Sequence, residues 1–174
     1  YFPKLSDAPL NPSYESANAD EYIRHSYKGG WCYVVKGKER QVFYNGVTAD
    51  VNSLYPSVMH SASGNRYPVG KPTWWKGDIP DEALKPERYY FVRLKTRFYL
   101  KDGKLPFIQS KGNPFYKGTE MLETSDVYLK KTGKYYKKLV DKDGNIHDTR
   151  VTLTLTCTDY ELFKEHYRLE ECEI

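Results

Sequence analysis

The sequence predicts an α+β fold that is rich in strands, with antiparallel hairpins and two or three short helices. Three observations predict it. Apolar and aromatic runs are joined by Asp-Gly pairs at 102–103 and 143–144, which are typical of tight hairpin turns. Residues 151–156 alternate Val or Leu with Thr, as in a strand with one buried face. Residues 158–171 carry apolar side chains at the spacing of an amphipathic helix.

The N-terminal part begins with a segment that has no apolar period. Residues 1–20 are rich in Pro, Ser, Asn and Ala, which predicts an extended lead-in. Residues 31–51 hold two apolar, aromatic runs around the polar segment 36–40, which indicates a β-hairpin. Asp50 is then expected near the end of the second strand of that hairpin.

A short helix is expected directly after that hairpin. Residues 53–62 begin with Ser53, which suits the N-cap position, and Pro56 falls in the first turn, where its missing N–H costs nothing. Residues 62–88 contain Gly and Pro at short intervals, which predicts a boundary between two parts of the chain. One helical turn is expected there, at residues 81–84.

The second half of the chain is predicted to hold most of the strands. Residues 88–100 form a long strand, and the Asp-Gly pair after it turns the chain into residues 104–110. The second Asp-Gly pair joins residues 134–140 to residues 147–156.

The last predicted element is the helix over residues 158–171. Thr158 or Asp159 is expected to cap its N-terminus. Leu162, Phe163 and Tyr167 are expected on its inward face.

The composition is that of a water-soluble domain. The chain has 174 residues, 39% hydrophobic and 29% charged, and no apolar run approaches the length that crosses a membrane. No signal peptide opens the sequence, and its first residue, Tyr1, suggests a piece of a longer protein. The three cysteines are widely separated and match no zinc-site spacing, so we expect a reducing, cytoplasmic setting.

Positive charge is concentrated in one part of the chain. Residues 95–142 hold twelve Lys or Arg against five Asp or Glu, a local balance of +7, while the net charge of the whole chain is +4. Aromatic residues are interleaved with these lysines. Such a stretch suits nucleic acid or an acidic protein partner. A lysine-rich face that is only solvated is the alternative.

The stretch "DVNSLYPS", residues 50–57, places a carboxylate, hydroxyls and a tyrosine close together. Such a string before a helix is also ordinary capping chemistry. Its surroundings make it informative. Upstream, "YKGG" at residues 27–30 suits a tight loop whose backbone a ligand can approach closely. Downstream are "LPFIQSKGNPFYKGTEML" and "CTDYELFKEHYRL".

Together these stretches resemble the protein-primed family B DNA polymerases of bacteriophages. "DVNSLYPS" is similar to the first polymerisation motif of that family, and "YKGG" to the Tyr-x-Gly-Gly loop that joins its exonuclease and polymerase modules. "IQSKGNPFYKG" resembles the inserted region that contacts the terminal protein, and "DYELFKEHY" resembles the return to the palm. The resemblance runs from about residue 20 to the C-terminus.

The resemblance implies roles for the first motif in two-metal phosphoryl transfer. Asp50 would bind Mg²⁺ with its carboxylate and Val51 with its carbonyl, and the backbone N–H groups that follow would face the triphosphate. Tyr55, the second catalytic residue, would lie under the incoming sugar and exclude a 2′-hydroxyl. The implied nucleotide-binding residues are Val51, Asn52, Ser53, Leu54 and Tyr55.

The implied partners are a DNA template and primer, deoxynucleoside triphosphates and a terminal priming protein, without a membrane. The residues expected to contact DNA are Tyr27, Gly29, Gly30, Lys111, Lys117, Lys130, Lys131 and Lys134. One departure concerns the position after Lys111. Relatives carry several basic residues there, whereas this chain has Gly-Asn-Pro at 112–114, and the downstream lysines would have to compensate.

The implied active site is incomplete in this chain. The family also uses an Asp-Thr-Asp hairpin and a lysine-bearing fingers helix, and neither pattern is present. The nearest match, Thr158-Asp159-Tyr160, opens a helix instead. We therefore expect a fragment, part of the palm with the inserted subdomain, that does not polymerise DNA alone. The expected division is a lead-in (1–20), a palm portion (21–61), the insertion (62–155) and a return to the palm (156–174).

Two other functions are compatible with the residues. The first is a binding module for nucleic acid or protein that is derived from such a polymerase and has no catalysis. The second is a small Mg²⁺-dependent hydrolase built on Asp50, Asp141, Asp143 and Asp148. The run "DKDGN" has the chemistry of a hairpin turn and lacks the pattern of a Ca²⁺-binding loop, which argues against the hydrolase.

Overall fold

The structure is a computed structural model that describes residues 18–35, 37–109 and 121–174. The chain forms two compact units: a larger unit of residues 1–31 with 71–174, and a smaller unit of residues 32–70. Each unit is described by itself. Among the described helices, none has the length and apolar character needed to cross a bilayer.

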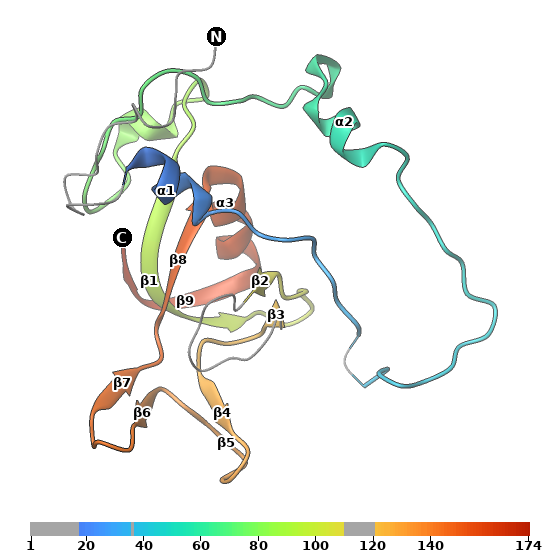
Figure 1. The fold of residues 1–174 in the computed structure, drawn as a ribbon, viewed down its shortest axis with the longest axis vertical. Coiled ribbons are helices and arrows are strands. Elements are labelled where there is room, and N and C mark those ends of the chain that lie inside the picture. Colours follow the sequence, from blue (N-terminus) through green and yellow to red (C-terminus); the bar gives the residue numbers. More distant parts are fainter. Residues whose placement is uncertain (1–17, 36, 110–120) are drawn as a thin grey trace. The chain divides into compact units, whose positions relative to one another are not determined.

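A three-stranded antiparallel sheet with the order β8-β1-β9 organises the larger unit (Figure 1). Its strands are β1 (Phe91–Leu100), β8 (Val151–Thr156) and β9 (Tyr167–Glu173). Leu94 of β1 lies opposite Leu153 of β8, and Phe98 lies opposite Leu169 of β9. The long strand and the alternating strand predicted from the sequence are confirmed.

The helix α3 (Cys157–His166) packs its apolar side chains against this sheet. Its N-cap is Thr156, whose hydroxyl accepts a hydrogen bond from the backbone N–H of Asp159 at 3.1 Å. The predicted cap at Thr158 or Asp159 is therefore wrong. Thr156 is both the last residue of β8 and the cap, so the helix starts without any intervening loop.

The helix is shorter than predicted, and its inward face is different. It ends at His166, and Tyr167 already has the extended backbone of β9. Tyr160 and Phe163, three residues apart, form the buried face, whereas Leu162 is 38% exposed. The prediction for Phe163 is confirmed and that for Leu162 is wrong. Tyr167 is buried as predicted, but from the strand.

Tyr167 is the centre of the core. Its ring contacts Phe98 and Phe163 with centroid distances of 5.2 and 5.1 Å. Its hydroxyl donates to the carbonyl of Leu122 at 2.9 Å and accepts from the N–H of Phe107 at 2.9 Å. Burial raises the pKa of Tyr167 to about 12, so the phenol stays protonated and can donate.

Two short strands, β2 (Ile108–Gln109) and β3 (Met121–Leu122), pair with each other beside this core. The turn at Asp102-Gly103 is present, with Gly103 at a φ of +73°. However, the segment after the turn does not pair back onto β1, as the sequence had suggested. β9 occupies one edge of β1. On the other edge β8 pairs with Phe91 to Thr96, and residues 123–125 bond to Phe98 and Leu100 beyond it, so no edge remains for that segment.

Residues 127–148 form two successive hairpins, here called the arm. Its strands are β4 (Val127–Leu129), β5 (Lys134–Tyr136), β6 (Lys138–Val140) and β7 (Ile146–Asp148). The predicted turn at Asp143-Gly144 joins β6 to β7. Asp141 stabilises this turn by accepting hydrogen bonds from the N–H groups of Asp143 and Asn145, both at 2.9 Å.

Arg97 connects the arm to the sheet, and its side chain is only 2% exposed. Its guanidinium donates to the carbonyl of Lys137 and to the hydroxyl of Thr149, both at 3.0 Å, and to the carboxylate of Asp148 at 2.7 Å. Its Nε also lies 3.2 Å from the carboxylate of Glu171 in β9. One buried cation thus holds the base of the arm and the C-terminal strand on β1.

Two short helical elements complete the larger unit. The helix α1 (Ala19–Arg24) is capped by Asn18, which accepts from the N–H of Glu21 at 2.9 Å. No apolar period marks this segment, and the helix was not predicted. The 3₁₀-helix η3 (Asp81–Leu84) confirms the predicted helical turn.

The smaller unit contains the helix α2 (Leu54–Met59) and the 3₁₀-helix η2 (Ser61–Ser63). Within its described residues the hairpin predicted over 31–51 does not form, and no strand is present. An isolated two-stranded hairpin is marginally stable without a third strand or a covering helix. The apolar side chains of this segment have no such cover, as shown by the exposure of Val42, Tyr44 and Val47.

Replacing Arg97 with Met should destabilise the larger unit by about 2–3 kcal/mol, because several charge-assisted hydrogen bonds are lost at a buried site. The matched control is Arg88→Met. Arg88 pairs with Glu82 at the surface, and such pairs contribute about 1 kcal/mol or less. Urea denaturation followed by circular dichroism measures the free energy of unfolding of both variants. If both variants lose the same free energy of unfolding, the role of Arg97 is contradicted.

Candidate functional site

The motif residues 50–55 lead into α2 and are all exposed. Asp50 lies in irregular backbone, so the prediction that it ends a strand is wrong for this structure, because the hairpin itself is missing. Its carboxylate forms no ion pair with a described residue. Tyr55 is the second residue of α2 and is 73% exposed. Packing within the smaller unit therefore does not explain either side chain.

Ser53 occupies the N-cap position of α2, but it does not cap the helix as predicted. Its backbone is left-handed, with a φ of 49°, and its side chain makes no capping hydrogen bond. Such a backbone is uncommon for a residue other than glycine. The first intrahelical bond runs from the N–H of Ser57 to the carbonyl of Ser53 at 2.9 Å. Pro56 lies in the first turn, as predicted.

The other end of α2 is held by three side chains that were not predicted to do so. The carbonyl of Val58 accepts hydrogen bonds from Ser63, Asn65 and Tyr67 at 3.0, 2.7 and 3.2 Å. Such carbonyls at a helix C-terminus lack intrahelical partners. Three donors from the segment that follows, residues 63–67, therefore fix the end of the motif helix locally.

In the larger unit, Gln109 of β2 holds the "YKGG" loop. Its side-chain amide donates to the carbonyls of Gly29 and Gly30 at 3.4 and 3.1 Å. In a trans peptide the carbonyl and the next N–H point in opposite directions. The N–H groups of Gly30 and Trp31 therefore face away from Gln109. Trp31 is also fixed, because its indole N–H donates to the carbonyl of Pro106 at 2.8 Å.

Gly30 is not required by packing among the described residues. A Cβ built on it would meet no described atom within 4 Å, and its φ is not in the left-handed region. The space at Gly30 therefore suits the close approach of a ligand to the backbone. This fits the prediction that Gly29 and Gly30 contact DNA, which stays a prediction.

A cavity of about 200 Å³ adjoins this loop and is mainly polar. Its lining residues come from the loop, β1, β2 and β8: His25, Tyr27, Lys28, Arg93, Gln109, Thr152, Leu153 and Thr154. Arg93 and Thr154 are register partners on the sheet. Of this set, only Tyr27 was predicted as a site residue. The alternation of Arg93 with buried residues in β1 is a signal that could have added it.

The acidic residues of the hydrolase hypothesis have structural partners. Asp141 lies 2.7 Å from the ring of His147 and accepts from two backbone N–H groups of its turn, and these bonds lower its pKa. Burial opposes the ionisation of Asp148, but hydrogen bonds from Arg150 and the charge of Arg97 outweigh it and lower the pKa. In the part of the chain that the structure describes, no three His, Cys, Asp or Glu side chains cluster as metal ligands.

The predicted DNA-contacting lysines fall into two groups. Lys111 and Lys117 lie outside the described residues. Lys130, Lys131 and Lys134 lie at the tip of the β4–β5 hairpin and are exposed. They belong to the larger unit with the "YKGG" loop, whereas Asp50 and Tyr55 belong to the smaller unit.

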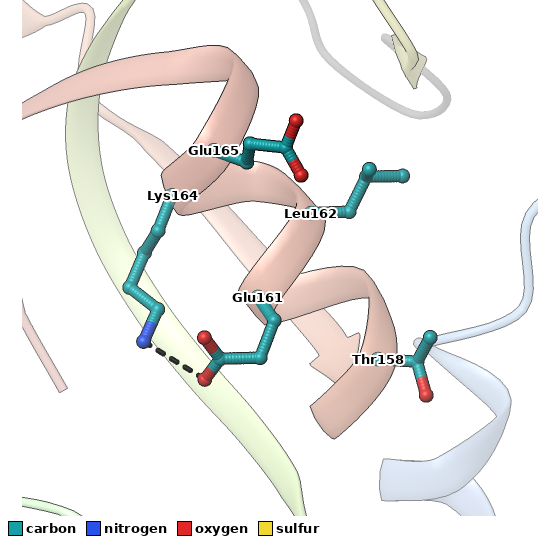
Figure 2. Close-up of a pocket in the computed structure, with 5 residues that line it drawn as sticks. All are labelled: Thr158, Glu161, Leu162, Lys164 and Glu165. Atoms are coloured by element: carbon teal, nitrogen blue, oxygen red, sulfur yellow. Dashed lines mark ion pairs between the residues drawn. The ribbon is translucent and has the colours of Figure 1, made fainter.

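A second hollow follows the outer side of α3 (Figure 2). Thr158, Glu161, Leu162, Lys164 and Glu165 line it, and Glu161 pairs with Lys164 at 2.8 Å. Figure 2 shows these side chains projecting from the helix without converging on a point. The hollow is a solvated helix face and supports no catalytic arrangement.

Comparison with known proteins assigns the family. The family model for DNA polymerase type B, organellar and viral, matches residues 4–169. The chain belongs to this family of DNA polymerases. The resemblance and the α+β fold class inferred from the sequence are both confirmed.

Phage polymerases are among the relatives of this type B polymerase chain. It is 37% identical to the DNA polymerase of Bacillus phage Nf over 173 residues, which are 99% of this chain and 24% of that protein. It is 34% identical to the DNA polymerase of Bacillus phage phi29 over 158 residues, 91% and 23% of the two chains. The chain thus spans about a quarter of the length of these relatives.

A solved structure supports the same assignment. The structure of the phi29 DNA polymerase complexed with primer-template DNA and incoming nucleotide substrates is similar to this chain. The match covers 88% of this chain and 22% of the phi29 polymerase chain. The TM-score is 0.63 at 32% sequence identity.

Replacing Gln109 with Leu should release the "YKGG" loop of this polymerase chain. The loss of about 1 kcal/mol of hydrogen bonding predicts about fivefold faster trypsin cleavage after Lys28. The matched control is Gln41→Leu, since Gln41 donates to the carbonyl of Gly37 in the smaller unit at 2.7 Å. Cleavage is followed by mass spectrometry. An unchanged rate at Lys28 would show that Gln109 does not hold the loop.

Proposed function

We propose that the chain is part of a DNA polymerase that adds deoxynucleotides by two-metal phosphoryl transfer and is primed by a terminal protein. The observation that carries the proposal is Asp50: an exposed carboxylate without a described ion pair, four residues before the start of α2, in a chain of this family. The DNA polymerases of phages Nf and phi29 support the activity, and the phi29 complex with DNA and nucleotides supports the substrates.

The residues present fit one half of a magnesium site. The carboxylate of Asp50 and the carbonyl of Val51 are hard oxygen ligands of the kind that Mg²⁺ prefers. When bound, paired Mg²⁺ ions stabilise the attacking 3′-oxygen and the leaving pyrophosphate. One carboxylate does not hold two ions, so the second set of ligands has to come from outside this motif. The chain alone is therefore proposed to be inactive.

The other motif residues bind the nucleotide. The backbone from Asn52 to Leu54 faces the triphosphate, and the ring of Tyr55 lies under the sugar. A 2′-hydroxyl then collides with the ring, so the site admits deoxynucleotides. The 73% exposure of Tyr55 leaves its ring available for this contact.

The rest of the chain positions DNA and the priming protein. We place the lead-in at 1–20, the palm portion at 21–61, the terminal-protein-contacting insertion at 62–155 and the return to the palm at 156–174. The "YKGG" loop and the lysines of the insertion contact template and primer. The setting proposed for this polymerase activity is the cytoplasm of a bacterial host, as for a phage-encoded enzyme.

A binding module without catalysis is the second candidate. It is favoured by the segment Val127–Val140, which has five lysines and no Asp or Glu. Such a segment binds anionic partners whether or not a complete active site is present. Activity of a polymerase that contains this chain separates the two candidates.

Asp50→Asn, made in a polymerase that contains this chain, should abolish nucleotide addition and leave the fold intact. The amide keeps the shape of the side chain but removes the charge that binds Mg²⁺. Primer extension with Mg²⁺ measures the activity, and Asp78→Asn, at another exposed aspartate, is the control. Extension by Asp50→Asn at near-normal rates would remove Asp50 from the metal site.

Tyr55→Val should relax sugar discrimination in the same enzyme, because it deletes the ring that excludes the 2′-hydroxyl. Tyr55→Phe is the matched control, since it keeps the ring and should keep the discrimination. The measurement compares incorporation of ribonucleotides and deoxynucleotides. If Tyr55→Val leaves that ratio unchanged, Tyr55 does not select the sugar.

A further inference from the structure

Two tyrosines lie side by side on one face of the β4–β5 hairpin. Tyr128 and Tyr135 are register partners, and their ring centroids are 5.1 Å apart with an interplanar angle of 52°. They are 48% and 60% exposed. The neighbouring pair in the register, Val127 and Tyr136, belongs to the other face of the hairpin, and Val127 is buried. The hairpin therefore packs with one face and leaves two rings in solvent on the other.

Positive charge surrounds these rings without compensation. Lys130, Lys131 and Lys134 form the tip of the hairpin, and all three are exposed. None of them forms an ion pair with a described residue. Asp and Glu are absent from the whole segment Val127–Val140. A partner that fits this surface has to be anionic.

Two other aromatic rings of the basic stretch 95–142, those of Phe98 and Tyr99, are already covered. Phe98 is fully buried in the core. The face of Tyr99 is occupied by two cations, the ammonium of Lys137 at 5.6 Å and the guanidinium of Arg168 at 5.2 Å. Among the described residues, the ring contact of Tyr128 and Tyr135 is with each other. The described residues therefore leave the outer faces of both rings open to a planar ligand.

The hairpin is fixed at its base, which preorganises the two rings. The N–H of Ser125 donates to the carbonyl of Phe98 at 3.1 Å, and the hydroxyl of Ser125 accepts from the N–H of Phe98 at 3.2 Å. At the other end, Arg97 holds the carbonyl of Lys137. Both ends of the segment that carries the tyrosines are thus tied to β1. Ligands lose less entropy on a surface that is already ordered.

We propose that this face of the hairpin binds single-stranded DNA, with unpaired bases stacked on Tyr128 and Tyr135 and phosphates held by Lys130, Lys131 and Lys134. The proposal deepens the proposed polymerase function and rests on it for the choice of DNA. Combined aromatic platforms and lysines are the general chemistry of single-strand binding. Paired bases inside a duplex do not offer their faces, so the surface selects the single strand.

The ring geometry defines how the bases bind. A base sandwiched between two rings needs a separation of about 7 Å, twice a van der Waals contact. The centroids of Tyr128 and Tyr135 are closer than that, at 5.1 Å. Each ring therefore offers only its outer face, and the two tyrosines take two different bases of the strand.

The test is an anisotropy titration of the 174-residue chain with a labelled single strand and with the duplex of the same sequence, at low and at physiological salt. The chain should prefer the single strand. Tyr128→Ala and Tyr135→Ala should each weaken single-strand binding about fivefold or more and leave duplex binding unchanged. The double variant Tyr128→Phe/Tyr135→Phe keeps both rings and should bind like the unmodified chain.

Two further variants separate stacking from charge and from packing. Replacing Lys130, Lys131 and Lys134 together by Gln should weaken binding of both DNA forms and reduce the salt slope for the single strand by about 2. Val140→Ala shortens an apolar side chain that is 68% exposed elsewhere on the arm and should have no effect. A loss in the Phe double variant equal to that in the Ala variants would overturn the stacking role.

Photocrosslinking gives a readout that does not depend on the Ala variants folding. A single strand that carries 5-iodouracil should crosslink to Tyr128 and Tyr135, as located by mass spectrometry. Crosslinks only at other residues would overturn the proposal. Equal affinity for the single strand and the duplex would also overturn it. A third contradicting outcome is that the chain binds no single strand but self-associates, and that Tyr128→Ala abolishes this self-association. Primer extension by the Asp50 variants tests the polymerase function separately, so the two failures are distinguishable.

Discussion

The buried guanidinium of Arg97 is the group on which the arrangement of the larger unit depends. A charge taken out of water is costly unless it is paired and hydrogen-bonded. Arg97 meets this requirement only when three distant segments come together: Lys137 at the arm, Asp148 and Thr149 at its return, and Glu171 in β9. The cost of leaving the cation unpaired is therefore what selects this arrangement of the arm and the C-terminal strand on β1.

Tyr167 likewise connects distant segments, and these lead to the "YKGG" loop. Its hydroxyl joins the carbonyl of Leu122 in β3 to the N–H of Phe107 just before β2, so the two short strands are fixed to the core through one phenol. Gln109 of β2 then holds the carbonyls of Gly29 and Gly30. A continuous set of contacts thus runs from the junction of α3 and β9 to the loop, and the loop geometry depends on aromatic packing far away in the sequence.

The sequence predicts the elements whose signals are local. The alternation in β8, the Asp-Gly turn of the arm and the helical turn of η3 all depend on a few adjacent residues, and all are present. The hairpin over 31–51 failed because a strand needs a partner that local pattern does not supply. The cap at Thr156 was missed because a strand residue doubles as the cap. For the site, the motif and loop were recognisable from resemblance, but the link through Gln109 joins residues about eighty positions apart and leaves no pattern in the sequence.

Comparison of the aspartates separates structure from function in this chain. Asp148 is bound to Arg97 and Arg150, and Asp141 accepts the N–H groups of its own turn, so both carboxylates stabilise the fold. Asp50 makes no such contact with a described residue, and its exposure means that its charge contributes little to folding. A carboxylate without a described structural partner, four residues before the start of α2, is available for the metal-ligand role proposed for Asp50. The lack of a described partner that makes Asp50 dispensable for stability is also what the proposed role as a metal ligand requires.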